Sequence, residues 1–221
     1  MMNTLIGNIV ARESQLIGLS LSTSEIEAFE RYAVELKKWN SKVNLTAITK
    51  DREIAIKHFI DSLTIAPYLS AGDRLLDIGS GAGLPIIPLK IIMPDISMVS
   101  VDAIAKKIHF QRHIIRLLNL NKIEVIHARI EELHKSMCNS FTVITSRAFT
   151  RLDRFVALAA PLLAEGGRLI AMKGEQAECE VSASDNCLSA SGFTVDSIQR
   201  YTLPENMGER VLTFLKSSKA P

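Results

Sequence analysis

The sequence predicts an α/β fold with a mostly parallel sheet, an antiparallel C-terminal edge and an N-terminal helical extension. Apolar residues recur at helical spacing within residues 1–65, whereas short apolar segments alternate with helical stretches in residues 66–221. A glycine-rich turn follows the first of those segments. Such alternation is typical of a parallel sheet that helices cover on both faces. We therefore expect a helical extension over 1–65 and a sheet domain over 66–221.

Length and composition limit the class of protein. The chain has 221 residues, 47% of them hydrophobic, and its net charge of +2 excludes a grossly basic tail. The cysteines are odd in number and lack the pairing of metal ligands, which predicts a reducing compartment and no metal site. No apolar run approaches the roughly 20 residues that span a bilayer, and no signal-peptide pattern is present. We expect a soluble, cytoplasmic protein without a membrane partner.

In the N-terminal part, Ser22 and Glu25 match the capping box that begins a helix. Four residues then recur on one helical face: Phe29, Tyr32, Leu36 and Trp39. We expect this face to pack against the sheet domain, with a base-stacking platform as the alternative.

The sheet elements follow in order. The apolar segments predict five parallel strands and then two strands of an antiparallel edge, at 74–78, 97–101, 123–127, 141–145 and 168–172, then 193–195 and 211–215. Pro85 and Pro88 suit the first turn of a helix after the first strand, and Pro94 ends that helix. Pro204 predicts the turn between the last two strands.

The glycine-rich turn lies in residues 75–85, LLDIGSGAGLP. A dinucleotide fingerprint would place a glycine where this chain has Leu84, and Asp77 would repel a pyrophosphate. The turn itself contains Gly79, Ser80, Gly81 and Gly83. This pattern favours S-adenosylmethionine, which carries an ammonium and a sulfonium but no phosphate, over NAD or ATP. The alternative is a tight turn that binds no ligand.

The ends of the other strands carry further candidates, because ligands of such sheets bind beyond the carboxyl ends of the strands. Asp102 ends the second strand and suits either the hydroxyls of a ribose or the cap of a helix over 103–118. Ile130 and Glu131 follow the third strand, where they suit an adenine. Arg147 follows the fourth, and it either faces the crevice or pairs with a nearby acid.

Several motifs resemble known families. The glycine turn, VD at 101–102 and EGGRLIAMKG at 165–174 resemble class I (Rossmann-like) S-adenosylmethionine-dependent methyltransferases. Four segments resemble the RsmG family, also called glucose-inhibited division protein B: WNSKVNLTAIT at 39–49, HFIDSL at 58–63, ARIEEL at 128–133 and TSRAFTRLD at 145–153. The similarity is weaker near the C-terminus, at YTLP and ERVLTFLK.

The resemblance implies an enzyme that methylates N7 of one guanine in the helix-18 loop of 16S ribosomal RNA. By position it implies cofactor contacts from Gly79, Leu84, Arg147 and the pair Ile130 and Glu131, with Asp102 on the ribose. This chain departs from the family at Ile86, where glycine is common, and at Ala103, where a small polar residue is common.

Methylation of guanine N7 needs no catalytic base, because N7 has a free lone pair and no proton to lose. We therefore expect no catalytic acid or base and a mechanism of positioning. Arg147 is a candidate clamp for the cofactor carboxylate or for an RNA phosphate.

RNA contacts are predicted at two places. Arg112 and Arg116 share a helical stripe with His109 and His113, which predicts either phosphate contact or a solvated face. Arg151, Arg154 and Lys173 lie near strand ends, and Phe149 is the candidate for base stacking.

The expected partner is 16S rRNA or the small ribosomal subunit, and we expect a monomer. Alternatives are a class I methyltransferase acting on another RNA, a protein or a small molecule, and a non-catalytic RNA-binding protein that retains the cofactor fold. A dehydrogenase would need a sixth-position glycine and a proton relay, which the sequence lacks.

Overall fold

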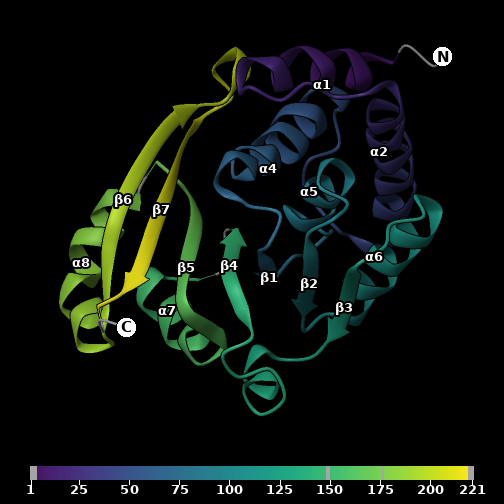
Figure 1. Ribbon diagram of the computed structural model, residues 1–221. Helices are drawn as coiled ribbons and strands as arrows, with labels where there is room; N and C mark the ends of the chain where they lie inside the picture. Colours follow the sequence, from purple (N-terminus) through teal and green to yellow (C-terminus); the bar gives the residue numbers. More distant parts are fainter. Residues whose placement is uncertain (1–3, 148–149, 176, 219–221) are drawn as a thin grey trace.

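A seven-stranded sheet organises the protein, in the strand order β3-β2-β1-β4-β5-β7-β6 (Figure 1). This computed structural model describes residues 4–147, 150–175 and 177–218. The strands are β1 Arg74–Ile78, β2 Ser97–Asp102, β3 Ile123–His127, β4 Phe141–Arg147, β5 Leu163–Gly174, β6 Phe193–Thr202 and β7 Glu209–Ser217. β1 to β5 pair in parallel, whereas β7 is antiparallel to both β5 and β6. The predicted mixed sheet is therefore confirmed.

The α-helices occupy the N-terminal part and the connections between strands. They are α1 Leu5–Leu16, α2 Thr23–Val43, α3 Asp51–Glu53, α4 Asp61–Leu63, α5 Ile86–Ile92, α6 Ala105–Leu117, α7 Leu152–Ala159 and α8 Ala177–Ala190. A π-helix, η1 Ile54–Ile60, joins α3 to α4. Short 3₁₀ turns are η2 Ala66–Tyr68, η3 Ile130–His134, η4 Ala160–Leu162 and η5 Pro204–Asn206. Among the described helices, none is long and apolar enough to cross a bilayer.

Two apolar clusters lie on opposite faces of the sheet, because successive strand residues point to opposite sides. Leu75 of β1 packs into a cluster with α1, α2, η1 and α5. Its neighbour Leu76 packs into a second cluster with α7 and η3. The N-terminal helices thus cover one face of the sheet and share a continuous core with it.

The α2 helix shows how the extension joins the sheet. Its capping box is present, with the Ser22 amide donating to Glu25 Oε2 at 2.6 Å. Phe29, Tyr32 and Leu36 are fully buried, and the half-buried Trp39 packs on Phe110 of α6 at a ring distance of 5.6 Å. The predicted packing of this face against the sheet domain is confirmed.

The observed strands extend beyond the predicted segments at the C-terminal edge. β6 spans 193–202, whereas the apolar pattern predicted only 193–195. It is an edge strand with exposed polar side chains such as Thr194 and Gln199. Because these polar residues interrupt the apolar pattern, only the first three residues of the strand were predicted. β4 likewise continues to Arg147, which therefore lies inside the strand end and not after it.

Candidate functional site

A cavity of about 380 Å³ lies at the carboxyl ends of β1 to β4. Six of the predicted site residues line it, contributed by the turn after β1, by β2 and β4, by α7 and by η3: Gly79, Asp102, Ile130, Glu131, Arg147 and Arg154. Residues that are far apart in the sequence therefore meet at the edge where the ligands of parallel sheets bind.

The glycine turn is held open by its backbone conformation and by Asp102. Gly79, Gly81 and Gly83 have φ of 74°, 60° and 88°, a region that favours glycine. Asp102 accepts hydrogen bonds from the amide of Gly81 through Oδ2 and from the amide of Ile104 through Oδ1, both at 2.9 Å. Its carboxylate thus joins the turn to the start of α6. Asp102 lies two residues before the N-cap position of that helix, so it braces the helix start without being its cap.

The other residues of the turn lie behind the cavity. Ser80 is buried and donates its hydroxyl to the Asp77 backbone carbonyl at 3.1 Å. Leu84 belongs to the apolar core, and Gly83 faces Ile87 and Tyr32. These residues, with Gly81, do not appear among the cavity lining, so their direct contact with a cofactor stays a prediction. Their observed role is to support the turn.

Asp77 is a buried carboxyl of β1, just before the glycine turn. Neither of its oxygens has a hydrogen-bond partner among the described residues, and the side chain is fully buried beside the turn. Desolvation raises the pKa of Asp77 to about 7, against the opposing field of Arg147. Burial thus disfavours the charged form of Asp77, and a ligand that carries positive charge would favour it.

This burial predicts a pH dependence of stability. Because the folded pKa lies above the unfolded value of 3.8, the folded protein holds a proton that the unfolded chain has lost. Unfolding free energy should therefore fall as the pH rises from about 4 to about 7, by at most about 4 kcal/mol for a shift of this size. Urea unfolding at several pH values measures it, and Asp77→Asn should remove this component.

The Asp73→Asn variant provides a control of opposite sign. Asp73 accepts hydrogen bonds from Ser70, Thr142 and Arg168, which hold its pKa below the usual value despite its burial. Asp73 therefore stabilises the fold above pH 4, and its loss should leave the Asp77 component intact. If the unfolding free energies of the wild type and of Asp77→Asn depended on pH in the same way between pH 4 and 7, the prediction would be contradicted.

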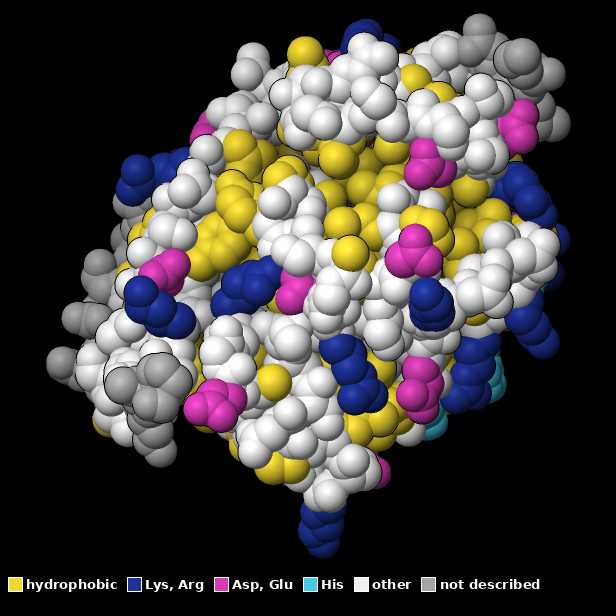
Figure 2. Space-filling view, in the orientation of Figure 1, with side chains coloured by type: hydrophobic (Ala, Val, Ile, Leu, Met, Phe, Trp, Pro, Cys, Tyr) yellow, Lys and Arg dark blue, Asp and Glu magenta, His cyan; other side chains and the backbone are white. Residues whose placement is uncertain are grey.

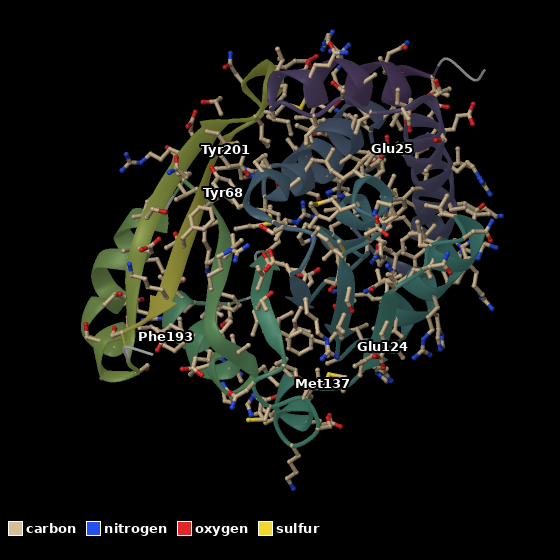
Figure 3. All side chains as sticks on the ribbon, in the orientation of Figure 1. Glu25, Tyr68, Glu124, Met137, Phe193 and Tyr201 are labelled. Carbon is tan, nitrogen blue, oxygen red and sulfur yellow. The ribbon has the colours of Figure 1, made fainter. Side chains whose placement is uncertain are left out.

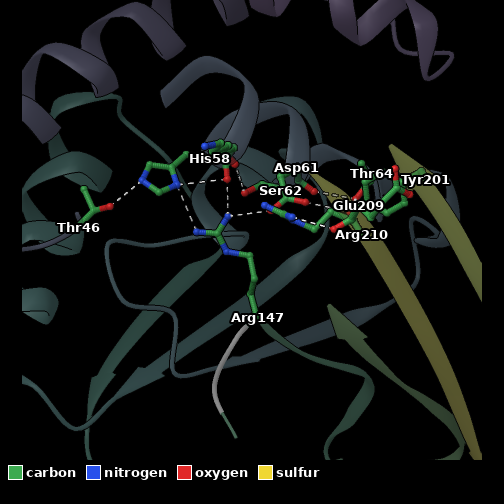
Figure 4. A network of polar contacts seen from close by, with 10 residues as sticks. Thr46, His58, Asp61, Ser62, Thr64, Arg147, Tyr201, Glu209 and Arg210 are labelled. Atoms are coloured by element: carbon green, nitrogen blue, oxygen red, sulfur yellow. Dashed lines mark hydrogen bonds and ion pairs between the residues drawn. The ribbon is translucent and has the colours of Figure 1, made fainter. Parts of the chain in front are cut away.

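Arg147 both lines the cavity and pairs with an acid. Its Nη1 donates to the Lys57 carbonyl at 3.0 Å and to Asp61 Oδ2 at 3.3 Å, and Nη2 lies 3.5 Å from His58 Nδ1 (Figure 4). His58 is neutral, because burial and the neighbouring Arg147 lower its pKa to about 3. The two alternatives for Arg147, a crevice residue and an ion-pair partner, are thus both present.

Reasoning from the sequence assigned no role to the partners of Arg147. Asp61 and His58 lie in the segment HFIDSL, where polar residues interrupt a buried apolar stretch. That interruption was the available signal. In the structure, the π-helical geometry of η1 also marks this segment, because such segments are frequent at functional sites.

The predicted RNA-binding residues differ in their exposure and in whether their charge is already paired within the protein. Arg154 is exposed at the cavity, and Arg151 is exposed while pairing with Asp153 at 3.3 Å. The Lys173 ammonium, by contrast, is bound by Glu180 at 2.9 Å and by the Thr150 carbonyl. Phe149 lies outside the described residues. The contacts of these residues with RNA stay predictions.

Arg112 and Arg116 line a separate groove between α6 and β3, together with Trp39 of α2. Arg112 also donates to the Val125 carbonyl at 3.0 Å. His113 of the same predicted stripe turns toward α2, where its Nε2 lies 2.7 Å from Glu35 Oε2. The stripe is therefore divided between a helix contact and an open groove.

Comparison with known proteins gives the family. The model of the GidB family, described as rRNA small subunit methyltransferase G, matches residues 25–207. The chain belongs to this family. A ribosomal RNA small subunit methyltransferase G from Geotalea uraniireducens is 44% identical over 215 residues, which cover 97% of this chain and 98% of the relative. A protein of the same name from Geobacter sulfurreducens is 46% identical and covers 89% and 90%.

Solved structures agree in fold. A SAM-dependent methyltransferase from Aquifex aeolicus superimposes with a TM-score of 0.58 at 14% identity, over 83% of this chain and 97% of that one. The protein is a methyltransferase with the class I fold, and S-adenosylmethionine is its cofactor. The cavity suits this cofactor, since it combines an acid that can bind a ribose, an apolar Ile130 and a cationic Arg147, and the buried Asp77 directly precedes the lining residue Ile78 in β1.

Proposed function

We propose that this methyltransferase modifies N7 of one guanine in the helix-18 loop of 16S ribosomal RNA. The family match over residues 25–207 carries this proposal. The cavity at the strand ends supports it, because it brings together residues from four strand ends that we propose bind the cofactor, and it has an exposed arginine, Arg154, in its lining.

Five of the predicted site residues that line the cavity have proposed tasks in cofactor or phosphate binding. Asp102 accepts the ribose hydroxyls, and Ile130 and Glu131 hold the adenine through apolar contact and backbone polar groups. Gly79 allows close approach of the backbone to the methionine moiety. Arg147 clamps an anionic oxygen, either of the cofactor carboxylate or of an RNA phosphate.

The chemistry asks for alignment and not for proton transfer. S-adenosylmethionine supplies an electrophilic methyl group on a sulfonium. Guanine N7 offers its lone pair without losing a proton, so no residue of the site has to act as a base. The protein positions the two partners in line, an effect that can contribute roughly 7 to 11 kcal/mol to lowering a barrier.

The surface limits how RNA is held. Figure 2 shows basic and acidic side chains interspersed on the face that it views. We therefore propose that individual arginines near the cavity, Arg154 first and Arg151 second, contact phosphates, and that the groove of Arg112 and Arg116 offers a further contact. Since Lys173 already holds Glu180, it ranks below them.

Arg154→Ala should raise the KM for RNA several-fold and leave the Kd for S-adenosylhomocysteine unchanged. The loss of one phosphate contact should also lower the slope of log affinity against log salt by about 1. Lys122→Ala is the matched control, because Lys122 is exposed but lies before β3, at the opposite end of the sheet from the cavity. Equal effects of both variants would contradict a specific role for Arg154.

Mapping of methylated nucleotides tests the function itself. Small-subunit RNA from cells with and without this protein should differ by a single N7-methylguanine in the helix-18 loop. Loss of a methyl group elsewhere would favour another RNA target. RNA binding without incorporation of labelled methyl would favour the non-catalytic alternative.

We further propose that the protein acts as a cytoplasmic monomer.

Methylation assays with naked 16S rRNA and with assembled small subunits would identify the substrate form.

A further inference from the structure

The position of Arg147 is determined by one short segment of the chain. Its three hydrogen-bond partners among the described residues lie in η1 and at the start of α4: the Lys57 carbonyl, His58 Nδ1 and Asp61 Oδ2. Of these groups only Asp61 carries a charge, since His58 is neutral. The side chains of Arg147 and Asp61 are 19% and 5% exposed. An ion pair so shielded from water is strongly directional, and breaking it leaves a buried charge unpaired.

Asp61 is in turn held by the C-terminal hairpin of β6 and β7. The Tyr201 hydroxyl donates to Asp61 Oδ1 at 2.9 Å, and Arg210 Nε donates to Oδ2 at 3.5 Å. The Tyr201 hydroxyl also lies 3.0 Å from Thr64 Oγ1. Figure 3 places Tyr201 where β6 meets the helical part of the protein. The carboxylate therefore receives donors from β4, β6 and β7, and both of its oxygens are oriented.

The charges of this network do not balance. Arg147 and Arg210 share the single carboxylate of Asp61, whereas the Lys57 ammonium is paired with Glu53 at 2.8 Å. Among these five groups one positive charge remains in excess, and Arg147, whose field also acts on the buried Asp77, presents its guanidinium to the cavity. This excess suits an anionic oxygen as the ligand.

We propose that Asp61 is a positioning residue, which aims the Arg147 guanidinium at an anionic oxygen of the bound cofactor or RNA. Tyr201 and Arg210 hold Asp61 for this task, so the C-terminal hairpin contributes to the cavity without lining it. The inference rests on the proposed clamp role of Arg147.

Asp61→Asn tests this, because asparagine keeps the shape and one acceptor oxygen but loses the charge. Two arms distinguish the source of the anionic oxygen: the Kd of S-adenosylhomocysteine without RNA, and the KM for RNA at saturating cofactor. We expect a loss of roughly tenfold or more in one arm, since hydrogen bonds to charged groups are the stronger ones. No change in either arm would overturn the proposal.

A double-mutant cycle with Arg147→Gln separates positioning from a merely structural role. If Asp61 acts through Arg147, the double variant should bind no more weakly than Arg147→Gln alone. If the double variant lost affinity by the product of the two single losses, the proposal would be overturned. Tyr201→Phe removes one donor to Asp61 and leaves the ion pair, so it should give a smaller loss than Asp61→Asn in the same binding measurement. If Tyr201→Phe lowered only the thermal stability, that result would also count against the proposal.

Asp73→Asn is the matched control. Asp73 forms a comparable ion pair with Arg168 at 2.8 Å, but it precedes β1, at the end of the sheet opposite the cavity. Asp73→Asn should lower the stability of the fold and leave both the Kd of S-adenosylhomocysteine and the KM for RNA unchanged. The wild type must methylate 16S rRNA in the same assay: its failure would count against the proposed function, whereas failure of the Asp61 variants to differ would count against this inference alone.

Discussion

Replacement of Asp102 with alanine is expected to weaken S-adenosylmethionine binding by roughly a hundredfold or more. The variant loses the acceptor for the Gly81 and Ile104 amides, each at 2.9 Å, and with them the link between the glycine turn and α6. It also loses the proposed bonds to the ribose. Hydrogen bonds to a charged group contribute roughly 1.5 to 3 kcal/mol each, and about 1.4 kcal/mol is a factor of ten in affinity. Isothermal titration calorimetry with S-adenosylhomocysteine measures the change.

Asp95→Ala is the control for Asp102. The Asp95 side chain is 85% exposed and pairs with Lys122 before β2, at the opposite end of the strand that Asp102 ends. It should bind the cofactor as the wild type does. Asp102→Asn keeps one acceptor oxygen and should fall between the two variants. An Asp102→Ala protein that is folded and binds within about threefold of the wild type, a difference below 1 kcal/mol, would contradict the ribose role.

The buried strands were predictable because their environment is uniform. Segment 74–78 agrees with β1 residue for residue, since a parallel strand with both faces covered is apolar nearly throughout. Segment 123–127 also agrees with β3, although β3 lies at an edge of the sheet and only its Val125 is buried. The edge strand β6 has no such covering on one side. Its polar positions interrupt the apolar run, and the pattern therefore underestimates its length.

The cavity was predictable where chain order and strand ends determine the position of a residue. Asp102, Ile130 and Arg147 all follow or end strands, and the topology of a parallel sheet brings strand ends together. The support of the cavity was not predictable in this way. Asp61 meets Tyr201 and Arg210 across 140 and 149 residues, and no local spacing encodes such a contact.

The glycines of the turn show the same limit. The spacing suggests one common task for Gly79 and Gly83, but only Gly79 lines the cavity. Gly83 turns toward α5, where Ile87 fills the space that a side chain would need. Sequence spacing indicates that a glycine is required at these positions. Only the packing shows whether the reason is a cavity, as at Gly79, or a close side chain, as at Gly83.

Gly83→Ala is expected to destabilise the fold by about 3 kcal/mol, the sum of two effects. At φ of +88° a residue with Cβ is strained, at a cost of roughly 1 to 2 kcal/mol. The new Cβ would also lie 2.4 Å from Ile87 Cδ1 and 3.2 Å from the Tyr32 hydroxyl, in a packed core where overfilling costs roughly 1 to 3 kcal/mol. Urea unfolding at constant pH measures the loss.

Gly18→Ala isolates the packing effect, because Gly18 has a similar φ of +79° and nothing within 4 Å of the added Cβ. It should cost only the conformational part, about 1 kcal/mol. The two variants would lose equal stability if the turn could move away from Ile87. That movement is opposed by the Tyr32 hydroxyl, which donates to the Ala82 carbonyl from a fully buried ring. Since Ala82 stands between Gly81 and Gly83, a displaced turn should also weaken cofactor binding, and Gly83→Ala should lose affinity where Gly18→Ala does not.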